Sequence, residues 1–313
     1  MSLKPKHLIQ KPIFHDHDGS IDDFVALIHL LTLDNYRLTG VSVTNANCYA
    51  DDAVETTLRI MDLFCRKDIE VAVSREEPIN SFPEEWRKNK EFVNSIDIIS
   101  GRKINKDRIN KLEASDFTAS KLLNEKEKTT IVLTGPASNL AKTFEKYPEA
   151  ISQVDKILWM AGAFLADGNV KAPDHDGSAE WNIFWNPNAA SGLLKTGIPI
   201  FLFPLDICKQ LPVDNYFMYH LNESKKEISQ LVYKMFEPLF STHERYYMWD
   251  VVPTVYLGKP ELFQFENTAI DVELRGTSRG NIYRTSKGSK IKYARSISDE
   301  DFYDFLLEQF QQF

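Results

Sequence analysis

The chain has 313 residues, 43% of them hydrophobic, with a formal net charge of −8 at pH 7. The apolar share is enough for a sizeable core, and the acidic balance argues against a nucleic-acid backbone or an anionic membrane as the main partner. The three cysteines, Cys48, Cys65 and Cys208, indicate neither a disulfide framework nor a Cys-x-x-Cys metal site. With no apolar signal segment and no run of about 20 apolar residues, a cytoplasmic location is expected.

Short apolar runs of strand length alternate with helix-like stretches along the chain. Strands are predicted at 11–15, 37–44, 69–73, 129–133, 156–160 and 198–203, and helices at 22–31 and 51–65. The alternation is typical of an α/β fold, here a single domain over 1–313 around a mostly parallel β-sheet flanked by helices. Residues 211–243 are predicted to be helical, and the poorly patterned segments 74–112 and 162–173 to be long loops.

Polar side chains gather directly after the predicted strands. They are Asp16 and Asp18 after the first strand, Asn45 and Asn47 after the second, Thr134 after the fourth and Asp206 after the sixth. Ligands bind at the carboxyl ends of the strands in sheets of this kind. One shared pocket is therefore expected at this edge of the sheet.

Four carboxylates stand within eight residues of the first strand end: Asp16, Asp18, Asp22 and Asp23. Packed this closely, they would repel one another unless they were protonated or bound to a cation. Oxygen ligands suit a hard cation such as Ca²⁺ or Mg²⁺. The alternative is that Asp22 and Asp23 only cap the following helix, but capping gives no role to Asp16 and Asp18. The cluster therefore predicts a metal site.

Two rival interpretations of this cluster differ in chemistry. An EF-hand loop counted from Asp16 fails, because Ile21 stands where the loop needs Gly and Leu27 where it needs Glu. The stretch Asp-His-Asp-Gly-Ser also resembles the first motif of haloacid dehalogenase-like phosphohydrolases, with Asp16 as the nucleophile. That alternative leaves Asp22 and Asp23 without a role.

Two tryptophans stand where a flat ring could be bound. Trp86 lies in Phe-Pro-Glu-Glu-Trp-Arg and is either a core plug or part of a lid that stacks on a ring. Trp249 precedes Asp250 at the start of an apolar run. Asp250 is predicted either to cap the helix that begins there or to face the pocket.

Two further stretches carry polar groups. Thr134 opens a Thr-Gly-Pro turn whose carbonyls are expected to face the pocket, although its later residues could serve only a helix start. Glu180 and Asn182 are two residues apart, so an extended backbone would point both to one side, where they suit sugar hydroxyls. Trp181 and Trp185 are predicted to be core or supporting residues.

Taken in order, these stretches resemble the inosine-uridine nucleoside hydrolase family, and most closely its inosine-adenosine-guanosine branch. The resemblance covers residues 14–250, most of the chain. The motifs are Asp-x-Asp-Gly-x-x-Asp-Asp, Thr-x-Ala-x-Cys, Phe-Pro-x-Glu-Trp-Arg, Thr-Gly-Pro-x-Ser-Asn, Gly-Asn-Val, Ala-Glu-Trp-Asn-Ile and Trp-Asp. Each motif alone is a weak signal, whereas their joint occurrence in this order is highly specific.

The resemblance implies Ca²⁺-dependent hydrolysis of the N-glycosidic bond of ribonucleosides, with purines preferred, to free base and ribose. Ca²⁺ would be held by Asp18, Asp23 and Asp250 and by the backbone carbonyl of Thr134. Asp18 would be the general base that activates an ion-bound water, and Asp16 would support the other carboxylates from behind. A homodimer or homotetramer is also implied.

The resemblance further implies a substrate site for a small nucleoside. Its expected contacts are Ser20, Asp22 and Asn182 on ribose hydroxyls, Asn169 and Glu180 near the 5′-hydroxyl, Asn47 near sugar and base, and Trp86 and Trp249 on either side of the purine. Stacking between two indoles would favour the positive charge on the departing purine.

Three positions depart from the purine branch. Ser20 stands where that branch usually has Asn, and Asn45 and Asn47 stand where it has Asp. Asn at 47 is typical of the less selective inosine-uridine branch, so a relaxed substrate range is the first alternative. A phosphohydrolase using Asp16 and a non-catalytic nucleoside-binding protein are the others, and a metal role for Asp250 separates the hydrolase from the phosphohydrolase.

Overall fold

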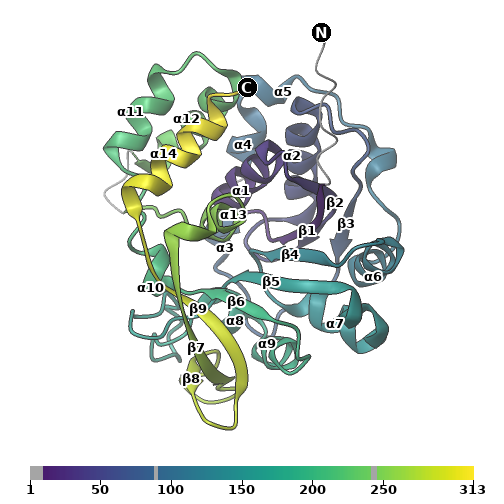
Figure 1. The fold of residues 1–313 in the computed structure, drawn as a ribbon, viewed down its shortest axis with the longest axis vertical. Coiled ribbons are helices and arrows are strands. Elements are labelled where there is room, and N and C mark those ends of the chain that lie inside the picture. Colours follow the sequence, from purple (N-terminus) through teal and green to yellow (C-terminus); the bar gives the residue numbers. More distant parts are fainter. Residues whose placement is uncertain (1–9, 88–90, 241–244) are drawn as a thin grey trace.

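The computed structural model describes residues 10–87, 91–240 and 245–313, apart from the side chains of Trp86 and Glu91 (Figure 1). The described residues form one nine-stranded sheet in the order β3-β2-β1-β4-β5-β6-β9-β7-β8. Its strands are β1 (Lys11–His17), β2 (Tyr36–Thr44), β3 (Val71–Ser74), β4 (Thr129–Leu133), β5 (Val154–Met160), β6 (Ile200–Phe203), β7 (Phe263–Val272), β8 (Ile282–Arg284) and β9 (Ser289–Ile297).

Helices cover both faces of this sheet (Figure 1). They are α1 (Ile21–Thr32), α2 (Ala50–Leu63), α3 (Glu84–Arg87), α4 (Glu91–Ser95), α5 (Asp97–Ser100), α6 (Ala114–Asn124), α7 (Ser138–Lys146), α8 (Trp181–Trp185), α9 (Pro187–Leu194), α10 (Leu205–Cys208), α11 (Asn215–Glu223), α12 (Glu227–Phe240), α13 (Val251–Gly258) and α14 (Asp299–Phe310). Short 3₁₀ turns are η2 (Lys106–Arg108), η3 (Pro148–Gln153) and η4 (Pro260–Leu262).

The predicted α/β class and all six predicted strands are confirmed. Strands β1 to β6 pair in parallel, and β9 continues the parallel set beside β6. Strand β1 runs two residues further than expected, through His17, so Asp16 lies within the strand rather than after it. The antiparallel pairs β7·β9 and β7·β8 form the carboxy-terminal edge of the sheet, for which the sequence pattern gave no prediction.

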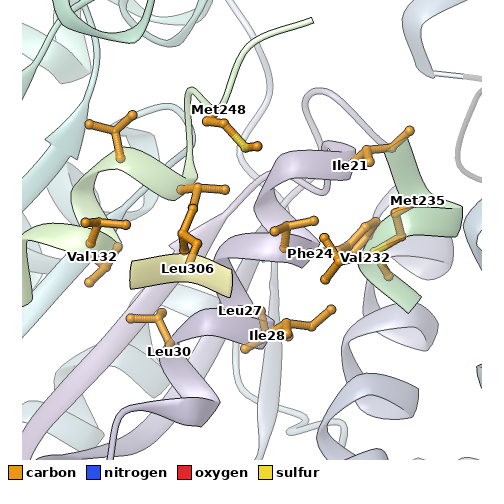
Figure 2. Packing of buried hydrophobic residues seen from close by; sticks show 14 of the residues in the cluster. Ile21, Phe24, Leu27, Ile28, Leu30, Val132, Val232, Met235, Met248 and Leu306 are labelled. Atoms are coloured by element: carbon orange, nitrogen blue, oxygen red, sulfur yellow. The ribbon is translucent and has the colours of Figure 1, made fainter. Parts of the chain in front are cut away.

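Helix α1 is the central element of the larger core. Its residues from Ile21 to Leu30 are all buried, because the helix is enclosed by the sheet and by α2, α12, α13 and α14. Figure 2 shows Phe24 and Leu27 of α1 among the side chains of Val232 and Met235 of α12 and Leu306 of α14. This enclosure fixes the position of the first turn of α1, which carries Asp22 and Asp23.

A second apolar cluster lies on the other face of the sheet, beneath α6, α7 and α9. Both faces are therefore covered, as the near-continuous apolar strands require. No helix within the described ranges is long and apolar enough to cross a membrane.

Candidate active site

A cavity of about 630 Å³ lies at the carboxyl ends of the central strands. It is lined by Asp18, Ser20, Ile21, Asp22, Asn47, Phe82, Thr134, Met160, Asn169, Lys171, Glu180, Trp181, Asn182, Leu239, Arg245, Tyr246, Trp249 and Asp250. Most of the predicted site residues belong to this lining. The exceptions are Asp16 and Asp23, which lie behind it, Asn45 and Asp206, which were expected to share the pocket and do not line it, and Trp86, whose side chain lies outside the described part of the chain.

The turn from β1 into α1 shapes the floor of the cavity. Gly19 adopts φ +83°, and a Cβ there would meet the Cβ of Ala53 at 2.7 Å and that of Cys48 at 2.8 Å, so only glycine fits. Ser20 is the N-cap of α1: its hydroxyl accepts from the Asp23 N–H, while its own N–H donates to Asp23 Oδ2 at 2.7 Å. This capping box fixes the start of α1.

Asp22 and Asp23 therefore have different roles. Asp23 caps the helix with Oδ2 and accepts from the Thr134 hydroxyl with Oδ1. Asp22 faces the cavity, where Oδ1 accepts from the hydroxyls of Ser20 at 2.6 Å and Tyr246 at 2.5 Å. The capping alternative is thus realised for Asp23, whereas Asp22 is held from the cavity side.

Asp250 stands at the start of α13 but makes no side-chain capping bond there. Its backbone N–H donates to Asp22 Oδ2 at 3.0 Å, and its Oδ2 lies 2.8 Å from the Ser20 hydroxyl. The interpretation of Asp250 as a helix cap is therefore wrong. Its carboxylate lines the cavity, because α13 packs against α1 and Asp250 bonds to Ser20 and Asp22 at the start of α1.

One hydroxyl proton serves two carboxylates at this point. Ser20 Oγ lies within hydrogen-bond distance of both Asp22 Oδ1 and Asp250 Oδ2, yet it carries a single hydrogen. Burial raises the pKa of Asp22, and repulsion from Asp23 adds to the effect. Burial raises the pKa of Asp250 well above its usual value, and repulsion from Asp22, Asp23 and Asp18 contributes further. An added proton or cation would relieve this crowding.

The donor chemistry at the floor fits a hard cation, since carboxylates and a backbone carbonyl are oxygen ligands. Among the residues that the structure describes, no three His, Cys, Asp or Glu side chains are arranged as a complete metal centre. Backbone and substrate oxygens would therefore have to complete the coordination shell. The Thr134 carbonyl lines the same floor and accepts from Asn182 Nδ2 at 3.2 Å.

The wall opposite is formed by Glu180 and Asn182. The expectation that an extended backbone aligns them is wrong, because only Glu180 is extended, with φ −103° and ψ 145°, and Asn182 lies in α8. Glu180 caps that helix, accepting from the Asn182 N–H with Oε1 and from the Gly162 N–H with Oε2. Burial raises the pKa of Glu180 to about 7. Both side chains nevertheless line the cavity.

Asp206 does not belong to the cavity, although it follows β6. Its carboxylate accepts the backbone N–H groups of Phe164, Leu165 and Ala166 at 2.8, 2.6 and 3.1 Å. The prediction that it shares the pocket is therefore wrong. A position after a strand end does not fix the direction of a side chain, and here three backbone donors turn the carboxylate toward the loop.

Aromatic side chains form part of the cavity wall. Trp249 packs edge-on against Tyr246, with ring centroids 4.9 Å apart. Trp181 is buried, as predicted for a core or supporting residue; it also lines the cavity and stacks on Phe82, with centroids 4.9 Å apart. Trp185 is fully buried, as predicted.

Comparison with known proteins identifies the class of this site. Residues 13–304 match the family model for inosine-uridine preferring nucleoside hydrolases. The chain belongs to this family. It is an N-glycosidic hydrolase, and the family is metal-dependent.

Individual relatives align with this chain over most of their lengths. The inosine-uridine preferring nucleoside hydrolase of Bacillus anthracis superposes with a TM-score of 0.92 and 31% identity over 97% of this chain and 100% of that chain. The pyrimidine-specific ribonucleoside hydrolase of Shewanella woodyi is 27% identical over 281 residues, 85% of each chain. The probable uridine nucleosidase 2 of Oryza sativa is 26% identical over 87% of this chain and 81% of its own.

The family assignment and the burial of Asp16 together exclude the phosphohydrolase. A nucleophile must reach its substrate, whereas Asp16 is 0% exposed and accepts from Asn139 Nδ2 at 2.6 Å inside the enzyme. Burial raises the pKa of Asp16 to about 7. Its backbone carbonyl accepts from the Thr134 N–H at 2.9 Å, while its carboxylate points away from the cavity lining.

Eight lining residues were not predicted as site residues: Ile21, Phe82, Met160, Lys171, Trp181, Leu239, Arg245 and Tyr246. Tyr246 is the most informative, because it bonds directly to Asp22. Its position three residues before Trp249 was the only available signal. Lys171 and Arg245 come from loop segments and Leu239 from the last turn of α12, positions at which the sequence carries no functional signal.

Proposed function

We propose that this enzyme catalyses Ca²⁺-dependent hydrolysis of the N-glycosidic bond of purine ribonucleosides, releasing the base and ribose. The observation that carries the proposal is the convergence of Asp18, Asp22 and Asp250 on one cavity, with Ser20 bonded to two of them. An oxocarbenium-like sugar develops positive charge when its C1′–N bond breaks. Fixed carboxylates around the cavity would stabilise that charge.

Each residue then has a defined task in the proposed reaction. Asp18 takes a proton from the attacking water, whose oxygen bonds to C1′. The base departs with the electron pair of the C1′–N bond and takes up a proton from solvent, and Asp18 releases its proton to solvent before the next turnover. Asp22 at the cavity floor and Asn182 on the opposite wall hold ribose hydroxyls, while Asn169 and Glu180 hold the 5′-hydroxyl.

The cation would be held by Asp18, Asp23, Asp250 and the Thr134 carbonyl. The shared Ser20 proton and the raised pKa values of Asp22 and Asp250 support a positive charge at this place. When bound, Ca²⁺ would supply Lewis acidity and positive charge at the floor. Asp23 would contribute while remaining fixed by Ser20 and Thr134.

A second candidate is a broader range that includes uridine. Asn47 lines the cavity where the purine branch has Asp, and the relatives at 31% and 27% identity carry inosine-uridine and pyrimidine names. Trp249, a large flat ring on the wall, favours purines instead, since a purine offers more surface for stacking.

The test is release of free ribose from inosine, adenosine, guanosine, uridine and cytidine, with Ca²⁺ and with a chelator. The proposal expects rapid release from the purine nucleosides that the chelator abolishes and Ca²⁺ restores. Release from none of the five would overturn the function, and equal kcat/KM for uridine and inosine would establish the second candidate. Asp18→Asn should lower kcat by about 10²–10⁴-fold. The exposed Asp167→Asn is the matched control.

A further inference from the structure

Two histidines on β1 lie directly beneath the site. His15 and His17 are both 0% exposed, and their rings stack with centroids 4.9 Å apart. His15 Nε2 lies 3.0 Å from the Thr134 hydroxyl, and His17 Nε2 lies 3.1 Å from that of Thr57. Neither ring lines the cavity. The proposed reaction gives neither of them a task.

The direction of the His15 bond follows from its neighbours. The Thr134 hydroxyl has one proton, and Asp23 Oδ1 is its close acceptor. Because that proton is directed at Asp23, the hydroxyl can only accept from His15. His15 must therefore carry its ring proton on Nε2.

The hydrogen bond from His15 to Thr134 determines which of two acceptors the Thr134 hydroxyl proton points to. The backbone carbonyl of Asp16 lies 3.5 Å from the same hydroxyl and is a competing acceptor. With His15 Nε2–H occupying a lone pair of Thr134, the remaining directions are restricted and the proton points to Asp23. Without His15, the hydroxyl can turn and leave Asp23 Oδ1 without its donor.

We propose that His15 is a positioning residue, which acts through Thr134 to fix the carboxylate of Asp23 directly behind the cavity floor. One oxygen of Asp23 is held by the Ser20 backbone and the other by the His15–Thr134 relay. The capping box alone holds one oxygen and leaves the carboxylate free to twist. The consequence for catalysis rests on the proposed function, because Asp23 matters there as a cation ligand.

His17 provides the matched control. It lies on the same strand and the same face, is equally buried, and also bonds to a threonine hydroxyl. Thr57, however, donates to the backbone carbonyl of Ala53 in α2. The two relays thus differ in their end point, a site carboxylate for His15 and a helix carbonyl for His17.

The experiment compares His15→Leu, His15→Gln and His17→Leu in the full chain by Ca²⁺ calorimetry and inosine kinetics. Residues behind a metal ligand typically contribute 10–100-fold, so His15→Leu should weaken Ca²⁺ binding and lower kcat by about that factor. His15→Gln keeps an N–H at similar reach and should recover both to within about threefold of wild type, as should His17→Leu. Equal losses in the two Leu variants, or no rescue by Gln, would reduce His15 to a packing residue.

A double-mutant cycle with Thr134→Val tests the route. If His15 acts through the hydroxyl, adding His15→Leu to Thr134→Val should cost less than about threefold further. Independent, additive losses would overturn the relay. The Val variant keeps the backbone carbonyl of residue 134, so the cycle isolates the side chain.

The ring tautomer gives a readout that needs neither substrate nor metal. Nitrogen NMR of the wild-type histidines should show His15 protonated on Nε2 and bare on Nδ1, and a proton on Nδ1 would contradict the proposal. If the wild type released no ribose, the proposed function would fail, while the tautomer and the Ca²⁺ titration would still decide the role of His15.

Discussion

The hydroxyl of Tyr246 donates a hydrogen bond to Asp22 Oδ1 at 2.5 Å, joining residues 224 positions apart in the chain. Burial raises the pKa of Tyr246 well above its usual value, and the charge of Asp22 adds to the effect. The phenol therefore stays protonated and remains a donor. It holds Asp22 from the cavity side while its ring supports Trp249.

Replacing Tyr246 by Phe keeps the ring and removes this donor. A hydrogen bond to a charged group contributes about 1.5–3 kcal/mol, so kcat/KM for inosine should fall by about tenfold or more. We expect the loss mainly in KM, because Asp22 is proposed to hold ribose in both ground and transition states. Tyr219→Phe, an exposed position outside the cavity, is the control. An unchanged KM in Tyr246→Phe would show that Asp22 needs no help.

Replacing Asp250 by Asn separates the effect of its carboxylate on protein stability from its effect on cation binding. Because the pKa of Asp250 is raised in the folded protein, the protonated carboxyl contributes to stability. That contribution is lost as pH rises through the folded-state pKa. The metal-free variant should therefore unfold at a higher temperature than the wild type at pH 8, by about 2–4 °C per kcal/mol. Ca²⁺ should raise the Tm of the wild type and not that of the variant. A lower Tm for the metal-free variant would contradict the crowding argument.

The buried carboxyl of Asp16 should make the stability of the metal-free protein depend on pH. Its pKa is raised to about 7, mainly by burial, above the usual value. The contribution of protonated Asp16 to the free energy of unfolding is thus fully present below about pH 4. It is lost as pH rises to about 7, at up to about 1.4 kcal/mol per pH unit.

In Asp16→Asn this ionisation is absent, so Tm should change less between pH 4 and 7 than in the wild type. Thermal unfolding in the presence of a chelator measures both slopes. Asp34→Asn, at an exposed position, should keep the wild-type slope. Parallel Tm curves for Asp16→Asn and wild type would show that Asp16 does not titrate in this range.

Trp249 tests the base specificity. Stacking of a base on an aromatic side chain contributes about 1–3 kcal/mol by alanine substitution, so Trp249→Ala should lower kcat/KM for inosine by about 5–150-fold. The loss for uridine should be smaller, because a pyrimidine has less ring surface. Equal losses for the two nucleosides would mean that Trp249 shapes the cavity without selecting the base.

The sequence predicted the parallel part of the fold well, because buried parallel strands are continuous apolar runs between helices. Strand β7 (Phe263–Val272) was missed because polar and charged residues interrupt its apolar residues, and its buried positions do not alternate regularly with exposed ones. The end of β1 was placed two residues early, because Asp16 and His17 look like loop residues. They are buried polar groups whose partners, such as Asn139 and Thr57, are distant in sequence.

The sequence predicted which residues form the site better than it predicted how they are arranged. The resemblance to the nucleoside hydrolase family implied that Asp18, Asp22 and Asp250 belong to one pocket, and the structure places them there. Residue spacing alone could not distinguish Asp22, which faces the cavity, from Asp23, which lies behind it, because that depends on the rotation of α1; only the resemblance assigned the two carboxylates different roles. The error on Asp206 has the same origin, since backbone donors from a distant loop decide where its carboxylate points.

The bond from the Asp250 N–H to Asp22 spans 228 residues, and this separation has a consequence for how the enzyme is made. At about 5–20 residues per second, the ribosome reaches residue 250 roughly 10–50 s after it has added Asp22. Strand β1 precedes Asp22 and strands β2 to β6 are all synthesised within that interval, so much of the parallel sheet can assemble while the floor is still open. A nascent chain arrested before α13 would hold most of its strands and none of its completed floor. Catalytic competence is therefore among the last properties that this fold acquires.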